Sequence, residues 1–586
     1  MKVAPGDRFM ILHVLACDYD GTIADHGHVS RETAAALARV RQSGRKVVLV
    51  TGRMLPDLRH VCPEVDEMFD AVVAENGAVL YLPSRREVKV LGDAPEPALV
   101  EGLRRRGVPL DLGSSILATL APFAEEAIAA IRDAGVERAL VFNRGALMLL
   151  PGGVTKGTGL EAALGTLGYS IHNVAGVGDG ENDHAFLSIC EFAIAVSDAV
   201  PALKDRADYV TREPASRGVT RFIAEHVLTD AATLAPQIRR HQLHVGEHSD
   251  GEPLRLPVHG THLLVLGPSA TGKSTLTGVL VERLVETGRS VCLLDPEGDY
   301  QSLSELEGVV VLGGKAEHAL PTADELEQLL RRPRSSLVLN LSAMSRAEKV
   351  EYGTKVLATV AATRSAVGMP HWLIVDEAHH IMPADGSPAT EALRPARDPI
   401  CLITLSVKDL AREVHGLPNT IASTDLAAFD ETLATLAAVR GTPCPRAMAG
   451  AEPLDHGEAA LAWLDGGAPG ATRFRVARRR VEHRRHIRKY TEGELPPDRS
   501  FFFRGPDGAL NLRAVNLVRF CELADGVDAA TWEFHLRRGD YSRWLREMIK
   551  DPELAVEVHG VEGNLAVDAA ESRREVLAAI RRRYAV

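Results

Sequence analysis

Two aspartates stand two positions apart, Asp18 and Asp20, directly after an apolar run in the stretch LACDYDGTIADHG. A strand of a parallel sheet opens toward the ligand crevice at its carboxyl end, which is where this pattern places Asp18. A carboxylate there can attack phosphorus and form an aspartyl phosphate, and a second acid can protonate the leaving oxygen and then activate water. Because two anions beside an anionic substrate repel one another, the pair predicts Mg²⁺ and a lysine at the same place.

The other parts of such a site occur further along the chain. Thr51, followed by Gly52, ends the β-type run VLVTGR, where its hydroxyl and amide can hold a phosphoryl oxygen. Lys156 in GGVTKGTGL begins a helical pattern and supplies the expected positive charge. Asp179 and Asp183 lie on the glycine-rich turn of VAGVGDGENDHAF, after another strand, and we interpret them as metal ligands.

This ordered set of segments, DYDGT, TGR, the lysine and GDGEND, resembles the haloacid dehalogenase (HAD) superfamily of phosphatases, in particular its Cof-like subgroup. The resemblance implies that Asp18 is the nucleophile and a Mg²⁺ ligand. It implies that Asp20 is the general acid and base and also binds the metal through its backbone carbonyl. The remaining implied roles are phosphoryl binding by Thr51, Gly52 and Lys156, Mg²⁺ ligation by Asp179 with Asp183 at or beside the metal, and orientation of the lysine or substrate by Asn182.

The rhythm of strands and helices changes between TGR and the lysine, over about residues 82–150. Cof-like enzymes carry there a cap that closes over the substrate, and the size of this insertion resembles the smaller caps of archaeal-type phosphoglycolate phosphatases. Sugar-phosphate phosphatases are relatives of the same group. The resemblance therefore implies a small phosphorylated metabolite as substrate.

A second phosphate-handling segment, LLVLGPSATGKSTLTGVLVERLV, fits a strand, a G-x-x-x-x-G-K-S loop and a helix. Gly267 and Gly272 allow backbone N–H groups to converge on the β-phosphate at the helix N-terminus. Lys273 would reach the β- and γ-phosphates, and Ser274, followed by Thr275, would hold Mg²⁺. The segment predicts a site for ATP.

The run HWLIVDEAHHIMP supplies the matching acidic strand end, with Asp376 placed to bind Mg²⁺ through water and Glu377 to polarise the attacking water. Together with HVGEHSDGEPLRLPVHG and LLDPEGDY, these segments resemble the FtsK/HerA-type ATPases over residues 244–425. That resemblance implies a homo-oligomer, a hexameric ring, in which Arg394 or Arg397 reaches the site of a neighbouring subunit.

These patterns together predict an α/β protein, because strands alternate with helices through both series. We expect a Rossmann-like HAD core with an inserted α/β cap, then a P-loop NTPase α/β domain, then a small and mainly helical C-terminal domain. The expected ranges are 1–230 for the HAD domain, with the cap at about 82–150, 244–450 for the ATPase domain, 451–495 for an Arg-rich helical linker and 496–586 for the helical domain.

The composition limits the binding partners and the cellular compartment that we expect for these domains. A net charge of -12 over 586 residues argues against a generic binder of nucleic acid or anionic membranes. No apolar run approaches the roughly 18 to 20 residues that span a bilayer, so we expect no membrane association. The cysteines are scattered within apolar runs, which is typical of core residues in a reducing compartment. We therefore expect a cytoplasmic protein.

Two segments near the C-terminus carry less specific signals. The stretch RFRVARRRVEHRRHIRKY, residues 473–490, is the most basic of the chain and reads as a solvated helix or as a surface for a phosphate-rich partner. The final block contains Trp532, Phe534, Tyr541 and Trp544 at helical spacings, which predicts a small aromatic core. We interpret this block as a regulatory or docking domain.

Three functions remain open on the sequence. The leading one is a Mg²⁺-dependent phosphatase of a small metabolite, fused to an ATPase of regulatory or motor role. The second is a nucleic-acid end-healing enzyme of the polynucleotide kinase-phosphatase type, in which Asp295 would be the base of the kinase. The third is a HerA-like DNA motor with an accessory phosphatase.

Overall fold

The structure is a computed structural model, and the chain forms two compact units that divide after Ala477. The described residues are 11–143, 145–230, 241–268, 271–314, 318–393, 398–441, 444, 452–455, 457–464, 471–480, 491, 495, 497, 500–506, 508, 510–549, 551–564 and 567–584. Among them, no helix combines the length and the apolar character needed to cross a membrane.

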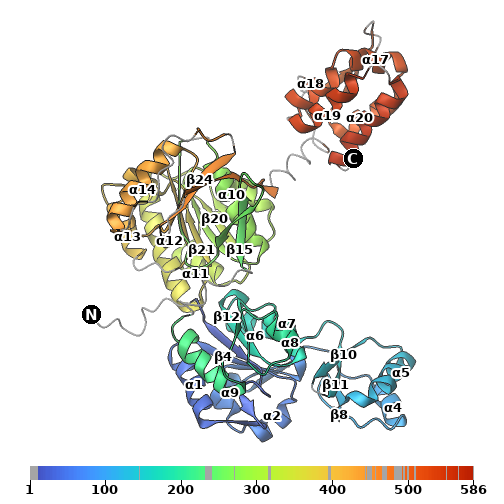
Figure 1. The fold of residues 1–586 in the computed structure, drawn as a ribbon, viewed down its shortest axis with the longest axis vertical. Coiled ribbons are helices and arrows are strands. Elements are labelled where there is room, and N and C mark those ends of the chain that lie inside the picture. The colour runs from blue at the N-terminus through green and yellow to red at the C-terminus, as the bar shows by residue number, and fades with distance from the viewer. Residues whose placement is uncertain are drawn as a thin grey trace. The chain divides into compact units, whose positions relative to one another are not determined.

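The N-terminal region is built on a mainly parallel sheet (Figure 1). The central strands of this sheet are apolar and buried on both faces. Strands such as KVVLV and VAGVG are almost wholly buried, as expected where helices cover a parallel sheet on both sides. In sheet order the strands are β14 (Tyr209–Val210), β13 (Phe192–Ala195), β12 (Val174–Gly178), β1 (Val14–Cys17), β4 (Lys46–Val50), β5 (Ala71–Ala74), β6 (Val79–Leu82) and β7 (Glu87–Val90).

Helices of this region connect the parallel strands. Helices α1 and α9 pack against one another, and α6 packs on β4, β5 and β6. The helices are α1 (Arg31–Gln42), α2 (Leu55–Val61), α3 (Val65–Met68), α6 (Lys156–Leu167), α7 (His184–Leu187), α8 (Pro201–Lys204) and α9 (Ala215–Phe222), and a two-stranded ribbon is formed by β2 (Ala24–Asp25) and β3 (His28–Val29).

A separate antiparallel sheet forms the predicted cap, with helices α4 and α5 on one of its faces (Figure 1). Its elements are β8 (Asp111–Leu112), β9 (Leu117–Leu120), β10 (Arg138–Asn143), β11 (Ala146–Pro151), α4 (Pro97–Arg105) and α5 (Ala124–Ala134). Strand β7 still pairs with β6 in the main sheet, so the expected start of the insertion at residue 82 lies inside the core.

The second α/β series forms a larger mixed sheet. In sheet order its strands are β16 (Pro253–Pro257), β15 (Gln242–Glu247), β25 (Ala471–Val476), β24 (Glu458–Trp463), β23 (Thr420–Ser423), β17 (His262–Leu266), β22 (Ile400–Thr404), β21 (Trp372–Val375), β18 (Val291–Asp295), β20 (Ser336–Asn340) and β19 (Val309–Gly313). Its helices are α10 (Lys273–Glu286), α11 (Ala323–Leu330), α12 (Arg346–Val367), α13 (Ala389–Ala392) and α14 (Leu426–Arg440). The predicted α/β fold class is confirmed in both series.

The prediction of a helical linker over 451–495 is wrong for most of the part of that segment that the structure describes. Strands β24 and β25 pair with one another, and β24 also pairs with β23, so they extend the second sheet. The run EAALAW is rich in residues with high helix propensity, but its four inner residues, 459–462, are buried in the sheet, and tertiary packing overrides propensity. Residues 481–490 of the basic stretch lie outside the described residues.

The C-terminal unit is mainly helical, as predicted. Its elements are β26 (Phe501–Phe503), β27 (Leu512–Ala514), α16 (Leu517–Gly526), α17 (Ala529–Arg537), α18 (Asp540–Glu547), α19 (Pro552–Glu562) and α20 (Ala569–Tyr584). Trp532, Tyr541 and Trp544 are buried in one core with Phe501 and Phe520, which confirms the predicted aromatic core. Phe534 is the exception, because it is half-buried at the surface.

Candidate active sites

Asp18 lies at the carboxyl end of β1, the strand between β12 and β4, and its side chain is only 8% exposed. The turn that follows is tight because Gly21 adopts a positive φ of 75°. This turn brings Thr22 across to the end of β12, where its hydroxyl donates to Asp179 Oδ1 at 2.9 Å. The first aspartate is thus held at the crevice edge of the sheet, as the sequence predicts.

Lys156 is the first residue of α6, and it points into the same place. Its Nζ donates to Asp18 Oδ1 at 2.5 Å and to Asp183 Oδ1 at 2.6 Å, and its side chain is 1% exposed. Burial alone would lower the pKa of this lysine, but the carboxylates of Asp18 and Asp183 outweigh burial and hold the pKa above its ordinary value. Lys156 is therefore a fixed ammonium between two carboxylates.

The start of α6 is fixed by a capping box and by a close backbone approach. Thr155 accepts from the Thr158 N–H, and Thr158 Oγ1 accepts from the Thr155 N–H. Gly77, at a φ of +107°, lies against this cap, and a Cβ there would come within 1.9 Å of the Thr155 carbonyl oxygen. Only glycine allows the loop after β5 to approach the helix so closely.

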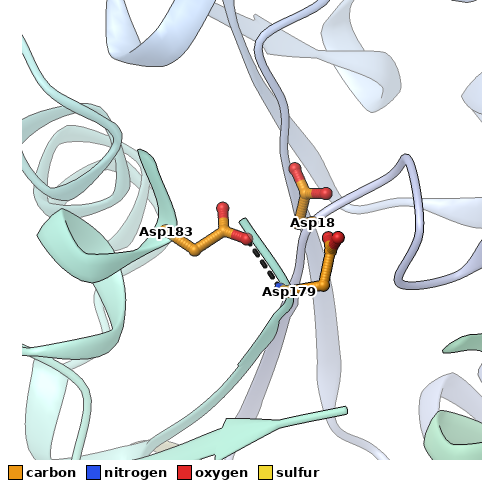
Figure 2. A group of neighbouring side chains, drawn as sticks. All are labelled: Asp18, Asp179 and Asp183. Carbon is orange, nitrogen blue, oxygen red and sulfur yellow. Dashed lines mark hydrogen bonds between the residues drawn. The ribbon is translucent and has the colours of Figure 1, made fainter. Parts of the chain in front are cut away.

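Asp18, Asp179 and Asp183 form one carboxylate cluster where β1 and β12 end (Figure 2). One oxygen from each lies within 4.8 Å of the others, and all three residues are buried. Asp183 is oriented by the backbone, since its Oδ2 accepts from the N–H groups of Asp179 at 2.8 Å and Gly180 at 2.9 Å.

The electrostatics of this carboxylate cluster fit a divalent cation. Burial raises the pKa of Asp18 well above its usual range, and repulsion from Asp183 and Asp179 adds to this although Lys156 opposes it. Three buried carboxylates face a single ammonium, so negative charge is in excess. Oxygen ligands and this charge suit Mg²⁺, with Asp18, Asp179 and Asp183 as the residues that would hold it.

Asp20, the predicted general acid and base, lies outside this carboxylate cluster. Its side chain is 46% exposed, and both its oxygens accept from Arg53, at 2.7 Å from Nε and 2.8 Å from Nη2. Arg53 also pairs with Asp57 at 2.6 Å. Thr51 and Gly52 of TGR were predicted as site residues, but this arginine was not, because its partner becomes evident only in the folded chain.

The predicted site residues Thr51, Gly52 and Asn182 lie close to Asn76, which the sequence pattern did not predict. Thr51 is 1% exposed at the end of β4, and Asn182 Nδ2 donates to Asn76 Oδ1 at 2.9 Å. A Cβ on Gly52 would lie 3.4 Å from Asn76 Oδ1 and 3.7 Å from Asn182 Nδ2, so the three are neighbours. Asn76 has a left-handed φ of 52°, a conformation that Asn-Gly pairs favour and that strand patterning does not reveal.

Glu75 connects this loop to the cap. Its buried carboxylate accepts from the N–H groups of Ser114 at 2.9 Å, Ser115 at 3.0 Å and Ile116 at 3.3 Å. Arg138 braces the same cap loop by donating to the Ser115 carbonyl at 2.8 Å. Glu75 therefore fastens the cap to the core at the edge of the site.

A small cavity of about 220 Å³ lies beside Lys156. Asn76 and Asn182 of the core line it together with Val141 and Leu150 of the cap. The cap thus supplies apolar walls and the core supplies polar groups, an arrangement typical of a small-molecule site.

The second candidate site is at the carboxyl end of β17. Lys273 is the first residue of α10, and its Nζ donates to the carbonyls of Gly267 at 2.8 Å and Pro268 at 3.0 Å. Gly267 and Gly272 have positive φ values of 142° and 111°, as a phosphate-binding loop requires. Ser274 and Thr275 follow Lys273 in the first turn of α10, and both are half-buried.

Asp376 and Glu377 face this loop from the end of β21, and the Glu377 carboxylate lies 3.8 Å from Lys273 Nζ. Burial, reinforced by Glu377 and Asp295, raises the pKa of Asp376 to about 8. Glu377 has a left-handed φ of 38°, a strained conformation for a glutamate. This crowding of carboxylates fits the Mg²⁺ that ATP brings. Arg394 and Arg397 lie outside the described residues.

Asp295, the base that a polynucleotide kinase would need, is occupied by the backbone. Its Oδ1 accepts from the Gly298 N–H at 2.7 Å and the Asp299 N–H at 3.1 Å, and its Oδ2 accepts from the Tyr300 N–H at 3.0 Å. The residue is 0% exposed. This arrangement is typical of a structural turn and does not favour the kinase alternative.

A buried carboxylate, a lysine and two further acids at the crevice edge of a parallel sheet are the arrangement expected of an enzyme of phosphoryl transfer. Residues 15–91 and 122–223 match the haloacid dehalogenase-like hydrolases, and residues 243–360 match the family described as helicase HerA, central domain. The chain belongs to the haloacid dehalogenase-like hydrolase family through its N-terminal region, and it carries a HerA-like ATPase domain. Both resemblances expected from the sequence are thereby confirmed.

The relatives of the N-terminal region are phosphatases. The phosphoglycolate phosphatase of Methanothermobacter thermautotrophicus is 33% identical over 221 residues, which are 36% of this chain and 97% of that protein. That of Aeropyrum pernix is 30% identical over 223 residues, 36% of this chain and 92% of that protein. A solved haloacid dehalogenase-like hydrolase from Bacteroides thetaiotaomicron has 18% identity and a TM-score of 0.33, and the match covers 36% of this chain and 98% of that one.

Proposed function

We propose that the N-terminal region hydrolyses a small phosphate monoester of the phosphoglycolate or sugar-phosphate type, through a covalent aspartyl phosphate on Asp18. The observation that carries this proposal is the bridge of Lys156 between Asp18 and Asp183 in a buried pocket. A buried ammonium between a nucleophile and a metal-binding carboxylate is suited to hold a transferring phosphoryl group.

The chemistry follows from the positions of the side chains. A carboxylate oxygen of Asp18 forms a bond to phosphorus as the ester oxygen leaves, and Asp20 gives that oxygen a proton. Water then attacks the aspartyl phosphate while Asp20 takes up its proton. Thr51 and Lys156 hold the phosphoryl oxygens in both steps. Mg²⁺, when bound by the three aspartates, supplies the positive charge that brings the anionic substrate beside the Asp18 carboxylate.

Asp20 must leave Arg53 to act in this way. Both its oxygens are bound to the arginine in the present structure, away from the carboxylate cluster. Because Asp20 and Arg53 are partly exposed, exchange of this pair for the substrate has a small energetic cost. We infer that substrate entry and the swing of Asp20 into the site occur together.

The size of the substrate is inferred from the cavity and from the relatives. A cavity of about 220 Å³ between core and cap suits a molecule of a few carbon atoms rather than a polymer end. The phosphatases that match this region are named for phosphoglycolate, a two-carbon ester. We therefore place 2-phosphoglycolate first among the candidate substrates and phosphorylated sugars second.

We propose that the second site hydrolyses ATP, with Lys273 and Ser274 on the phosphates and Mg²⁺, and Glu377 as the group that activates water. The HerA-like match supports a regulatory or motor role for this ATP turnover in a chain that also carries the phosphatase. A hexameric ring, and action on nucleic acid, are further parts of the proposal. Measuring ATP turnover with and without duplex DNA at low salt tests the latter, since no stimulation contradicts it.

The phosphatase proposal is tested with full-length wild type and Asp18→Asn on a panel of phosphate esters. We expect Mg²⁺-dependent phosphate release that is strongest on small phosphorylated acids, is lost in EDTA and falls at least about a thousandfold in the variant. Lys273→Ala serves as the matched control, because it disables the other site and should leave this release unchanged. Equal turnover by wild type and Asp18→Asn would refute the proposal.

A further inference from the structure

The C-terminal unit contains a groove that neither phosphate chemistry uses. Its cavity volume is about 520 Å³, within the range of small-molecule sites. Strand β26 and the turn after it line one side of the groove, and the end of α17 and one face of α18 line the other. The residues that give it chemical character are Arg504, Arg538, Arg543, Phe534, His535 and Trp544.

Two of the arginines lie on aromatic rings. The Arg504 guanidinium lies 5.4 Å from the centre of the Phe502 ring, and that of Arg538 lies 5.0 Å from the centre of the Phe534 ring. Stacking on a ring face fixes a guanidinium and leaves its N–H edge directed outward. Among the described residues, no carboxylate pairs with Arg504. Its donors are thus available in a fixed orientation.

The floor of the groove is held by a histidine and an aspartate. His535 is 5% exposed, and its Nε2 accepts the backbone N–H of Arg504 at 3.0 Å. The proton is therefore on Nδ1, which donates to Asp540 at 2.9 Å. This pair fixes the turn that carries Arg504 against α17 and α18.

The charges of the groove do not cancel. Asp540 also accepts from Arg543 at 3.2 Å and lies 3.5 Å from Arg538, so one carboxylate is shared by two guanidinium groups. Among the described residues of the lining, Glu547 is the only other acid. The described part of the lining thus has three arginines and two acids, an excess of positive charge, although the whole chain is acidic.

We propose that this groove binds a small phosphorylated molecule. The phosphate would accept from Arg504 and Arg538, which present the forked donors that match phosphate oxygens. The organic part would lie on the Phe534 and Trp544 side chains. The C-terminal unit is then a ligand-sensing unit attached to the two enzymes, and its site is distinct from both of theirs.

The test uses the full chain carrying Lys156→Ala and Lys273→Ala in every sample, because these changes remove the ammonium groups that would hold phosphate at the other two sites. Binding is measured by titration calorimetry with three probes: ADP, 2-phosphoglycolate and inorganic phosphate. We expect saturable binding of at least one probe, and its identity tells whether a flat ring, a short acid or the phosphate alone is recognised.

In the same background, Arg504→Ala and Arg538→Ala should each weaken that binding about tenfold or more, because each removes charge-assisted hydrogen bonds. Arg538→Lys should recover part of the loss. Arg537→Ala is the matched control: this arginine is the neighbour of Arg538, is 69% exposed and pairs with Glu533 outside the groove. Unchanged thermal unfolding confirms that each variant is folded. No saturable binding of any probe, or equal weakening by Arg537→Ala, would overturn the proposal.

Discussion

Arg289 Nη2 donates to both carboxylate oxygens of Glu191, at 2.7 Å and 2.8 Å, and so joins the ATPase sheet to the phosphatase. Glu191 is fully buried just before β13, and Arg289 precedes β18 with its side chain 2% exposed. His172 and His259 also reach the same carboxylate, at 2.7 Å and 2.5 Å. The buried Glu191 carboxylate therefore pairs with side chains from both α/β regions.

Removal of this anion is expected to destabilise the first unit. Glu191→Gln leaves a buried guanidinium without its partner, which costs about 3–5 kcal/mol of unfolding free energy. Denaturant unfolding of the full chain measures the loss. Arg334→Ala is a matched control, because Arg334 also pairs across the two regions, with Glu161 at 3.1 Å, but its side chain is 67% exposed. That control should change stability by less than about 1 kcal/mol, and an equal effect of both changes would contradict the prediction.

The same contact predicts sensitivity to acid. Burial lowers the pKa of His172, although Glu191 opposes this, so the folded protein keeps the imidazole neutral where the unfolded chain protonates it. The pKa of Glu191 is held well below its usual value of 4.5, chiefly by Arg289 and the adjacent histidines against the effect of burial, so it adds no slope above about pH 5.5. The stability from neutral His172 is thus complete above about pH 6.5 and falls as the pH drops below it.

His172→Asn tests this pH dependence, because the amide can donate to Glu191 in place of Nδ1–H but does not titrate. We expect the acid slope of the unfolding free energy between pH 6.5 and 5.5 to become shallower by up to about 1.4 kcal/mol per pH unit. Urea unfolding at several pH values gives both slopes. Parallel slopes for wild type and variant would show that His172 is not the responsible group.

The bond network of Glu75 predicts how the cap is held. Glu75→Gln replaces a carboxylate that accepts three backbone N–H groups by an amide with one oxygen, at a cost of about 1–3 kcal/mol to cap docking. Amide hydrogen exchange at residues 114–116 should become faster by one to two orders of magnitude, and the KM for the phosphate ester should rise. Exchange in the core strands β1 and β12 is the internal reference, and a uniform increase there would indicate global unfolding instead.

Glu377 is expected to act in ATP hydrolysis and not in ATP binding. Glu377→Gln keeps the size of the side chain but removes the group that activates water, so ATP turnover should fall by a factor of about 10² to 10⁴. Binding of a fluorescent ATP analogue should remain. Lys273→Ala provides the contrast, since it should lose binding as well. Phosphatase activity should be unchanged in both variants, and a parallel loss of that activity would show that the two sites are coupled.

The sequence predicts those site residues whose position is indicated by the residues next to them in the chain. Asp18, Lys156 and Lys273 each stand at a strand end or helix start that hydrophobic periodicity and glycines mark out. Three residues were not predicted, because each acts through a partner distant in sequence. Asn76 acts through Asn182, Glu75 through the cap loop, and Arg53 through Asp20. No local pattern encodes such pairings.

The misread strand β24 has a related cause. Its alanines favour a helix in isolation, and only the pairing with β23 makes the extended form the better one. The start of the cap was likewise misplaced, because β7 pairs back onto β6 and alternation within a hairpin does not tell which sheet it joins.

The contact of Gly77 with the first turn of α6 has a consequence for genetics. One added methyl group at residue 77 would meet the Thr155 carbonyl and push the helix, with its ammonium, away from the three acids. Gly77→Ala would then inactivate the first enzyme by steric displacement, although every ionisable side chain of the site is still present in the sequence. A strain carrying that allele would keep the second enzyme at normal dose, which separates the cellular contributions of the two.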